Sequence, residues 1–296
     1  MNQNKMACWV EAMRLRTLPV SIAGVILAIG LAVANDVFQL LPALLCLIFA
    51  VLAQIASNFG NEYYDYRDGL DAPGREGPRR GVTEGDITPQ AMLRATYATL
   101  AAACVVGCSL IAYGGWWLLP IGIVIALGAI AYSAGPYPLS RHGLGEVAVI
   151  AFFGVVPVTL TYYVQALNCP NEVWLSGLAA GMMGANVLIV NNYRDADADA
   201  AVGKRTLAVI LGRNAVRFIY LLNGLVAVAV MMPLWAKIGH SEVLAIPLLY
   251  LTGHLVLWLA LPRRKGHALT PILAATSMLM LFYCAGFTTA VSFCGV

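Results

Sequence analysis

The chain has 296 residues, of which 60% are hydrophobic and 11% are charged, and its formal net charge is +3. A soluble globular domain carries about 25% charged residues. This chain has too few to cover a water-facing surface, so its composition excludes a soluble globular protein. The small net charge gives no indication of nucleic-acid binding, and we expect an integral membrane protein in contact with a lipid bilayer.

Uncharged runs close to the length of a membrane span follow one another along the sequence. A helix needs about 20 apolar residues to cross the hydrocarbon core of a bilayer. The candidate spans are Leu18–Ala34, Phe38–Phe59, Ala95–Tyr113, Trp116–Ala134, Val147–Leu167, Val173–Val190, Phe218–Trp235, Val243–Leu261 and Ile272–Phe293. No segment of domain size separates them. The sequence therefore predicts an all-α, polytopic transmembrane bundle of nine helices that forms a single membrane-embedded domain over residues 1–296.

The basic residues alternate between the two sides of the predicted bundle. Lys237 is the only Lys or Arg in the connections after the first, third, fifth and seventh spans. All other basic residues precede the first span or lie around the connections after the second, fourth, sixth and eighth spans. Since Lys and Arg are retained on the cytoplasmic side, we expect a cytoplasmic N-terminus and, after nine spans, a C-terminus on the outer side.

Two long connections on the cytoplasmic side, at residues 60–94 and 191–217, hold 10 of the 15 acidic residues. Before and within the first connection, four polar residues follow the spacing i, i+3, i+7 and i+10: Asn58, Asn61, Asp65 and Asp68. On a helix this spacing produces one polar stripe. Gly69 is typical of a helix end, which leaves Asp71 on the following loop. We call Asn58, Asn61, Asp65, Asp68 and Asp71 the first cluster.

The second cluster, Asn191, Asp195 and Asp199, lies at steps of four residues on one helix face, from which Asp197 points away. Neighbours at this spacing have Cβ atoms roughly 5–6 Å apart, so their oxygens can share a divalent cation. Carboxylate and amide oxygens, completed by water and phosphate oxygens, describe a Mg²⁺ site. The alternative is a solvated acidic helix end. Two clusters that each begin with Asn and are separated by four spans favour a site, and they predict an internal four-helix pseudo-repeat around a central cavity.

Basic residues follow both clusters: Arg75, Arg79 and Arg80 after the first, and Lys204 and Arg205 after the second. Acidic residues that hold Mg²⁺, with Arg and Lys beside them, are typical of a diphosphate site. Retention of basic residues on the cytoplasmic side is the alternative interpretation. A diphosphate bound at a membrane surface beside an apolar cavity indicates an isoprenoid substrate.

Tyrosines near the cytoplasmic ends of the spans include Tyr132 and Tyr193. Ionisation of an allylic diphosphate leaves a carbocation, which an aromatic face stabilises by cation–π attraction. Tyrosines are also common at any membrane interface, so an anchoring role is the alternative for each of them.

These motifs resemble those of a known enzyme family. Residues 54–81 and 191–207 are similar to the two aspartate-rich motifs of UbiA-type intramembrane prenyltransferases. The similarity is greatest to bacterial 1,4-dihydroxy-2-naphthoate polyprenyltransferases of menaquinone synthesis, through Arg14-Leu-Arg-Thr17-Leu18-Pro19, the set Asn61, Asp65 and Asp71, Gly77-Pro78-Arg79-Arg80, and Gly143-Leu-Gly-Glu146. Two positions depart from the pattern. Gly69 stands where the wider family has Asp, and Glu62 stands where the subfamily has Asp.

The resemblance implies Mg²⁺-dependent transfer of a polyprenyl group from polyprenyl diphosphate to 1,4-dihydroxy-2-naphthoate, with decarboxylation, to give demethylmenaquinone in the bacterial inner membrane. The metal ligands that it implies are Asn61, Asp65, Asp71, Asp195 and Asp199, and the spacing of the two clusters adds Asp68 and Asn191. The catalytic residues that it implies are Lys204, Arg205 and Arg79, which stabilise the leaving group, and Glu146, which either orients a ring hydroxyl or caps a helix. The expected substrate-binding residues are Asn58, Arg14, Arg16, Arg80, Arg141, Tyr132 and Tyr193. Arg14, Arg16 and Arg141 are equal candidates for binding the acceptor carboxylate.

Two other functions compete with this interpretation. Within the same family, the acceptor could be another aromatic compound such as 4-hydroxybenzoate or haem. A cation-coupled transporter also places acidic residues at broken helices, but transport sites lie near the bilayer midplane. Both acidic clusters here are predicted at one membrane face.

Overall fold

The computed structural model describes residues 5–71 and 79–294, and within these ranges it contains helices and an isolated bridge between His142 and Arg205 but no strand. Eight helices of the described chain are long and apolar enough to cross a membrane, and Leu118–Ala131 is a shorter apolar helix. Each predicted span coincides with one of these helices. The predicted all-α, polytopic fold is confirmed, with the fourth predicted span as the short helix.

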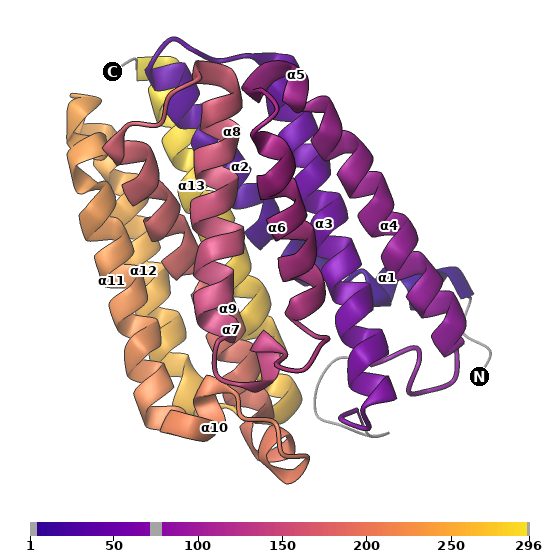
Figure 1. Cartoon of the computed structure of the whole chain (residues 1–296). Coiled ribbons are helices and arrows are strands. Elements are labelled where there is room, and N and C mark those ends of the chain that lie inside the picture. Colours follow the sequence, from indigo (N-terminus) through magenta and orange to yellow (C-terminus); the bar gives the residue numbers. More distant parts are fainter. Residues whose placement is uncertain (1–4, 72–78, 295–296) are drawn as a thin grey trace.

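The elements follow one another in a simple order along the chain (Figure 1). They are α1 (Lys5–Ala12), α2 (Leu18–Ala34), α3 (Leu40–Arg67), α4 (Pro89–Ser109), α5 (Ile111–Gly114), α6 (Leu118–Ala131), α7 (Gly145–Val149), α8 (Val156–Ala166), α9 (Asn171–Ala201), α10 (Leu207–Leu211), α11 (Arg213–Lys237), α12 (Ala245–Ala260) and α13 (Thr270–Cys294). A π-helical segment, η3 (Ile150–Val155), joins α7 to α8, and short 3₁₀ turns complete the chain.

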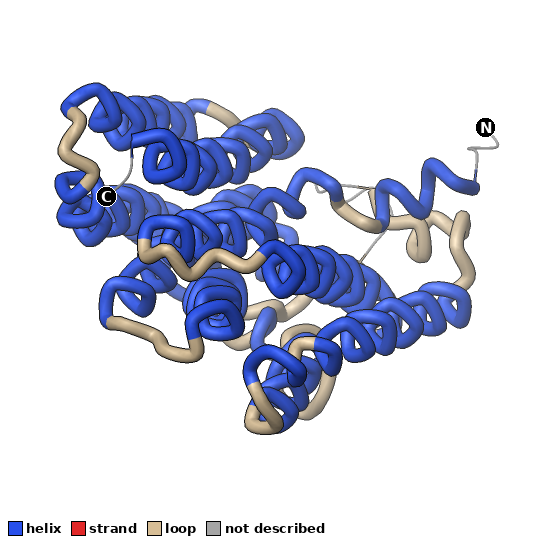
Figure 2. Tube along the Cα trace, turned by 90° about the horizontal axis from the view of Figure 1, so that it is seen from above, coloured by secondary structure: helices blue, strands red, loops and turns tan. Residues whose placement is uncertain are grey.

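The arrangement of the helices repeats between the two halves of the chain. In the first half α2 packs against α3 and α3 against α4; in the second half α8 packs against α9 and α9 against α11. The halves meet where α2 contacts α8, α9 and α13. Viewed from above in Figure 2, most helices are seen nearly end-on, while the N-terminal helix extends sideways from the bundle. The order of packing follows the predicted pseudo-repeat, with each cluster near the end of one long helix.

Both long helices continue beyond the apolar spans and carry the clusters on their last turns. α3 ends at Arg67, Gly69 has φ 70°, and the Leu70 N–H donates to the Asp65 carbonyl oxygen at 2.8 Å. The residue that ends this helix therefore has the left-handed backbone conformation that glycine favours, and the predicted end at Gly69 is confirmed. The segments 60–94 and 191–217 are therefore partly helical, since they contain the ends of α3 and α9, the start of α4 and all of α10.

Close backbone contact fixes α9 against the π-helical segment η3. A Cβ atom added to Gly154 would lie 2.2 Å from the Gly181 Cα, and one added to Gly181 would lie 2.6 Å from the Ile150 carbonyl oxygen. Small residues allow helices to approach this closely in membranes, where packing replaces the hydrophobic effect between helices. The contact sets the position of α9, and therefore of the second cluster, relative to α7 and α8.

The N-terminal helix α1 lies at the end of the bundle that carries the clusters. Cys8 and Ala12 are buried against Phe59 of α3 and Met92 of α4. α10 lies at the same end, and α13 finishes at the opposite end (Figure 1).

Candidate active site

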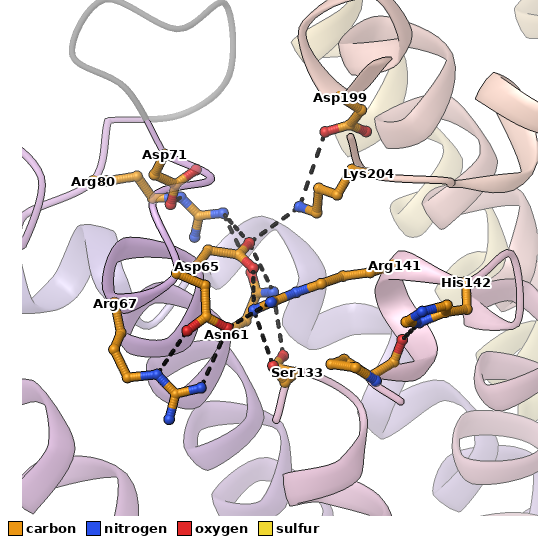
Figure 3. Close-up of polar contacts among 12 residues, drawn as sticks. Asn61, Asp65, Arg67, Asp71, Arg80, Ser133, Arg141, His142, Asp199 and Lys204 are labelled. Atoms are coloured by element: carbon orange, nitrogen blue, oxygen red, sulfur yellow. Dashed lines mark hydrogen bonds and ion pairs between the residues drawn. The ribbon is translucent and has the colours of Figure 1, made fainter. Parts of the chain in front are cut away.

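Asp65 is at the centre of the first cluster and is completely buried. Its Oδ2 accepts from Lys204 Nζ at 3.1 Å and from Asn61 Nδ2 at 3.2 Å, and its Oδ1 accepts from Arg141 Nη2 at 3.3 Å (Figure 3). Burial of a carboxylate is costly unless donors surround it. The donors to Asp65 come from α3, the α6–α7 connection and the α9–α10 connection.

Arg80 and Asn61 form a second set of contacts beside Asp65. Arg80 is buried. Its Nε atom lies 3.1 Å from Asp71 Oδ2, and its Nη2 atom donates to Asn61 Oδ1 at 3.2 Å. Arg14 donates to the same Asn61 oxygen at 2.7 Å. Glu62, the departure from the family pattern, accepts from the Val82 N–H at 3.1 Å. Its carboxylate therefore ties the 79–87 segment to α3.

Asp68 lies at the outer edge of the cluster. Arg67 Nε donates to its Oδ1 at 2.7 Å and Arg141 Nη1 to its Oδ2 at 2.6 Å. The hydrogen bond from Arg67, followed by that from Arg141, lowers the pKa of the Asp68 carboxyl below its ordinary value. Arg141 thus connects Asp68 to Asp65 and holds the C-terminal end of α3 in place.

The second cluster lies on α9 together with a buried arginine. Arg194 donates to both oxygens of Asp195, at 2.7 and 2.8 Å, and to Asn191 Oδ1 at 2.8 Å. On the same helix Asn192 donates to Glu146 Oε1 of α7 at 2.8 Å. The Glu146 Oε2 atom is buried and has no hydrogen-bond partner among the described residues.

Lys204 joins the two clusters. Its Nζ lies 3.1 Å from Asp65 Oδ2 and 3.9 Å from Asp199 Oδ1 (Figure 3). One positive charge is therefore already balanced between carboxylates of the two motifs, at a point where a divalent cation would have the same neighbours. In the part of the chain that is described, no three His, Cys, Asp or Glu side chains gather into a complete metal site.

A cavity of about 830 Å³ begins at the two clusters and extends through the bundle. Its polar end includes Asn61, Asp195 and Lys204, and its far end includes Leu118 and Val164, near the other end of the helices. Between these ends the wall is mainly apolar, with contributions from α2, α3, α4, α6, η3 and α8. The cavity has the shape and chemistry for an amphiphile with an anionic head and a long hydrocarbon tail.

The structure brings twelve of the eighteen predicted site residues to the lining of this cavity. They are Arg14, Arg16, Asn58, Asn61, Arg79, Arg80, Tyr132, Glu146, Asn191, Asp195, Asp199 and Lys204. The other six, which also belong to the described chain, lie outside the lining: Asp65, Asp68, Asp71, Arg141, Tyr193 and Arg205.

Those six residues differ in how they relate to the site. Asp65 contacts the lining residues Asn61 and Lys204, and Asp71 contacts the lining residue Arg80. Arg141 and Asp68 lie one step farther from the cavity, since Arg141 contacts Asp65 and Asp68 contacts Arg141. Tyr193 is buried and its ring faces the Arg213 guanidinium at 5.7 Å, away from the cavity. Arg205 is exposed, and its backbone N–H donates to the Arg141 carbonyl oxygen. Geometry therefore favours Lys204 over Arg205 for contact with a bound diphosphate.

Three residues that the sequence did not single out also belong to this site: Asn192, Arg194 and Ser133. Both Asn192 and Arg194 belong to the second motif. For Arg194 the sequence offered a signal, because an ionisable residue at the end of an apolar helix indicates a functional site. Ser133 accepts from Asn61 Nδ2 at 3.3 Å and had no signal in the sequence. Arg75, Gly77 and Pro78 lie outside the described residues.

Comparison with known proteins agrees with these features. A family model described as the UbiA prenyltransferase family matches residues 22–283. The chain is 38% identical to the 1,4-dihydroxy-2-naphthoate octaprenyltransferase of Escherichia coli over 81% of this chain and 82% of that protein. It is 35% identical to the protein of the same name from Mycobacterium tuberculosis over 97% of each chain. The structure of a UbiA homolog from Archaeoglobus fulgidus bound to DMAPP and Mg²⁺ has a TM-score of 0.69 at 16% identity, and covers 96% of this chain and 99% of that one.

Proposed function

This chain belongs to the UbiA prenyltransferase family, and on that premise we propose that it transfers a polyprenyl group from polyprenyl diphosphate to 1,4-dihydroxy-2-naphthoate in menaquinone synthesis. The reaction depends on Mg²⁺ and releases CO₂. The observation that carries the proposal is the position of Lys204 Nζ between Asp65 and Asp199, at the charged end of an apolar cavity. The name shared by the Escherichia coli and Mycobacterium tuberculosis relatives supports the acceptor.

The residues that would hold Mg²⁺ come from both clusters: Asn61, Asp65, Asp71, Asn191, Asp195 and Asp199. A bound Mg²⁺ neutralises negative charge on a diphosphate as its bond to carbon breaks. The archaeal homolog bound to DMAPP and Mg²⁺ supports the use of this metal. Asp68 lies at the outer edge of the site, so its contribution passes through Arg141.

Basic residues of this chain bind and stabilise the leaving diphosphate. Lys204, Arg79 and Arg80 line the charged end of the cavity and provide cationic donors for its outer oxygens. Fixed cations of this kind favour the transition state because charge on the departing oxygen increases as the bond breaks. Arg205, whose side chain is exposed, has a smaller share in this role.

The apolar part of the cavity receives the prenyl tail, and its wall keeps water away from the allylic carbon. When the C–O bond breaks, the electron pair leaves with the diphosphate and the allylic carbon becomes cationic. Tyr132 lines the cavity and provides an aromatic face near the charged end.

The acceptor lies beside Glu146, Asn192 and Arg14. Arg14 and Arg16 both line the cavity, and Arg14 is assigned to the acceptor carboxylate because its guanidinium reaches the charged end, where it donates to Asn61. Glu146 accepts a hydrogen bond from a ring hydroxyl through Oε2, while Asn192 holds its Oε1. The carboxylate-bearing ring carbon bonds to the allylic cation, and cleavage of its bond to the carboxylate returns two electrons to the ring. The products are CO₂, diphosphate and the reduced form of demethylmenaquinone.

The proposal places the enzyme in the bacterial inner membrane as a multi-pass protein. Its N-terminus and both clusters face the cytoplasm, and its C-terminus lies on the outer side. The distribution of Lys and Arg along the sequence supports this orientation.

The function is tested with membranes that contain the protein, Mg²⁺ and a polyprenyl diphosphate, given either carboxyl-labelled 1,4-dihydroxy-2-naphthoate or 4-hydroxybenzoate. We expect prenylated product and labelled CO₂ in equal amounts from the naphthoate, and neither without Mg²⁺. Product from 4-hydroxybenzoate alone would refute the proposed acceptor. Product from the naphthoate that retains the label would refute decarboxylation.

A further inference from the structure

Arg194 occupies the oxygens that the second cluster is predicted to offer to a metal. Its side chain is 1% exposed. Nε and Nη2 donate to the two oxygens of Asp195, and Nη2 also donates to Asn191 Oδ1. One guanidinium therefore engages two of the three residues of this cluster at once.

The remaining nitrogen of Arg194, Nη1, contacts neither Asp195 nor Asn191 through a hydrogen bond. Nη1 is buried and has no hydrogen-bond partner among the described residues, although a buried donor left without a partner is costly. Arg194 is also part of the cavity lining, next to Asp195 and Lys204. An unpartnered charged donor at this place has the chemistry to bind an anion that enters the cavity.

These contacts create a competition. A lone pair of Asp195 that accepts from a guanidinium is not available to a metal ion at the same time, and two cations close together repel each other. A diphosphate relieves the conflict, because its oxygens bind guanidinium groups strongly.

We propose that Arg194 is an exchange residue: it competes with the metal for Asp195 and Asn191, and it releases their oxygens when a diphosphate binds its guanidinium. This inference rests on the proposed function, since it takes the second cluster to be a metal site. The consequence is that binding of the metal and binding of the diphosphate are coupled. Without a diphosphate, Arg194 weakens metal binding, so the loaded site forms mainly when metal and diphosphate are both present.

The test measures binding of Mn²⁺, a Mg²⁺ substitute, to the full-length detergent-solubilised protein, with and without inorganic diphosphate. The variants are Arg194→Gln and, as a matched control, Arg213→Gln. Arg213 also pairs with an aspartate of α9, since its Nη1 lies 2.9 Å from Asp197 Oδ1, but that aspartate is exposed. Both variants remove one positive charge from the same region of the protein.

We expect Arg194→Gln to bind Mn²⁺ alone roughly 10- to 100-fold more tightly than the wild type, the factor that corresponds to charged hydrogen bonds. The metal-loaded variant binds inorganic diphosphate at least about tenfold more weakly, because it has lost a charge-assisted contact. Arg213→Gln changes neither affinity. A residue with a merely structural role would not produce these two opposite shifts.

Unchanged or weaker Mn²⁺ binding by a folded Arg194→Gln variant, judged by a wild-type melting temperature, overturns the proposal. If that variant does not fold, Arg194→Lys replaces it. Lysine keeps the charge but not the two-point contact, so Mn²⁺ binding tighter than wild type supports exchange, and equal binding overturns it. A wild-type protein that binds no Mn²⁺ with or without diphosphate refutes the proposed metal site itself, which is a distinguishable failure.

Discussion

Replacement of Lys204 by methionine removes the cation that joins the two clusters and keeps a similar side-chain length. At an effective dielectric constant of about 20, a charge pair at the 3.1 Å between Lys204 Nζ and Asp65 Oδ2 is worth about 5 kcal/mol before desolvation. Asp65 keeps Arg141 and Asn61 as partners. The net loss of stability is therefore closer to the about 1.5–3 kcal/mol of one hydrogen bond to a charged group.

Two measurements follow from this estimate. The melting temperature of the detergent-solubilised Lys204→Met variant falls below that of the wild type without Mg²⁺. Added Mg²⁺ raises it by more than in the wild type, because the metal then balances Asp65 and Asp199. The rate of prenyl transfer falls by about 10²–10³-fold, the loss that follows removal of one donor to an oxygen on which charge develops in the transition state.

The control is Lys265→Met, which removes an exposed positive charge from the connection before α13 and should leave both quantities unchanged. Arg205→Met should reduce transfer far less than Lys204→Met. If Lys204→Met melts and transfers like the wild type, Lys204 does not link the clusters and the reasoning is refuted.

Three further substitutions test separate parts of the structure. Arg141→Lys removes the two guanidinium nitrogens that pair with Asp65 and Asp68. The Mg²⁺ concentration for half-maximal transfer should therefore rise about 10–100-fold. No rise would mean that Arg141 does not position these carboxylates. Gly181→Val places side-chain atoms against the Ile150 backbone and should cost about 1–3 kcal/mol, seen as a lower melting temperature, and unchanged melting would contradict the close contact. Glu146→Gln should raise KM for the naphthoate with little change in KM for the diphosphate, and an equal rise in both would argue against a role in acceptor binding.

Much of the fold follows from the periodicity and charge of the sequence. Long apolar runs define the spans because the bilayer leaves no alternative partner for the backbone. The spacing of Asn61 and Asp65, and of Asn191 and Asp195, identifies the helix faces that carry the clusters, because positions four residues apart share a face. The short helix at Leu118–Ala131 is harder to recognise, since apolar composition does not distinguish a full span from a shorter apolar helix.

The contacts between distant segments could not be predicted in the same way. Nothing in the sequence indicates that Lys204 reaches Asp65, 139 positions away, because this depends on how α3 and α9 pack. The close approach of Gly154 and Gly181 depends on the π-helical segment and is likewise a property of packing. Tyr193 has the right position along the helix for a substrate contact, but its ring faces Arg213, and only the rotation of α9 decides this.

The central claim is that carboxylates from both motifs act together in one metal and diphosphate site. It is tested most directly by the rate of prenyl transfer to 1,4-dihydroxy-2-naphthoate in membranes that contain equal amounts of three variants: Asp65→Ala, Asp195→Ala and Asp197→Ala. Asp197 is two residues from Asp195 but has an 86% exposed side chain paired with Arg213. We predict that the first two variants lose transfer by at least about 10²-fold and that Asp197→Ala keeps the wild-type rate. Wild-type transfer by either Asp65→Ala or Asp195→Ala would contradict the claim.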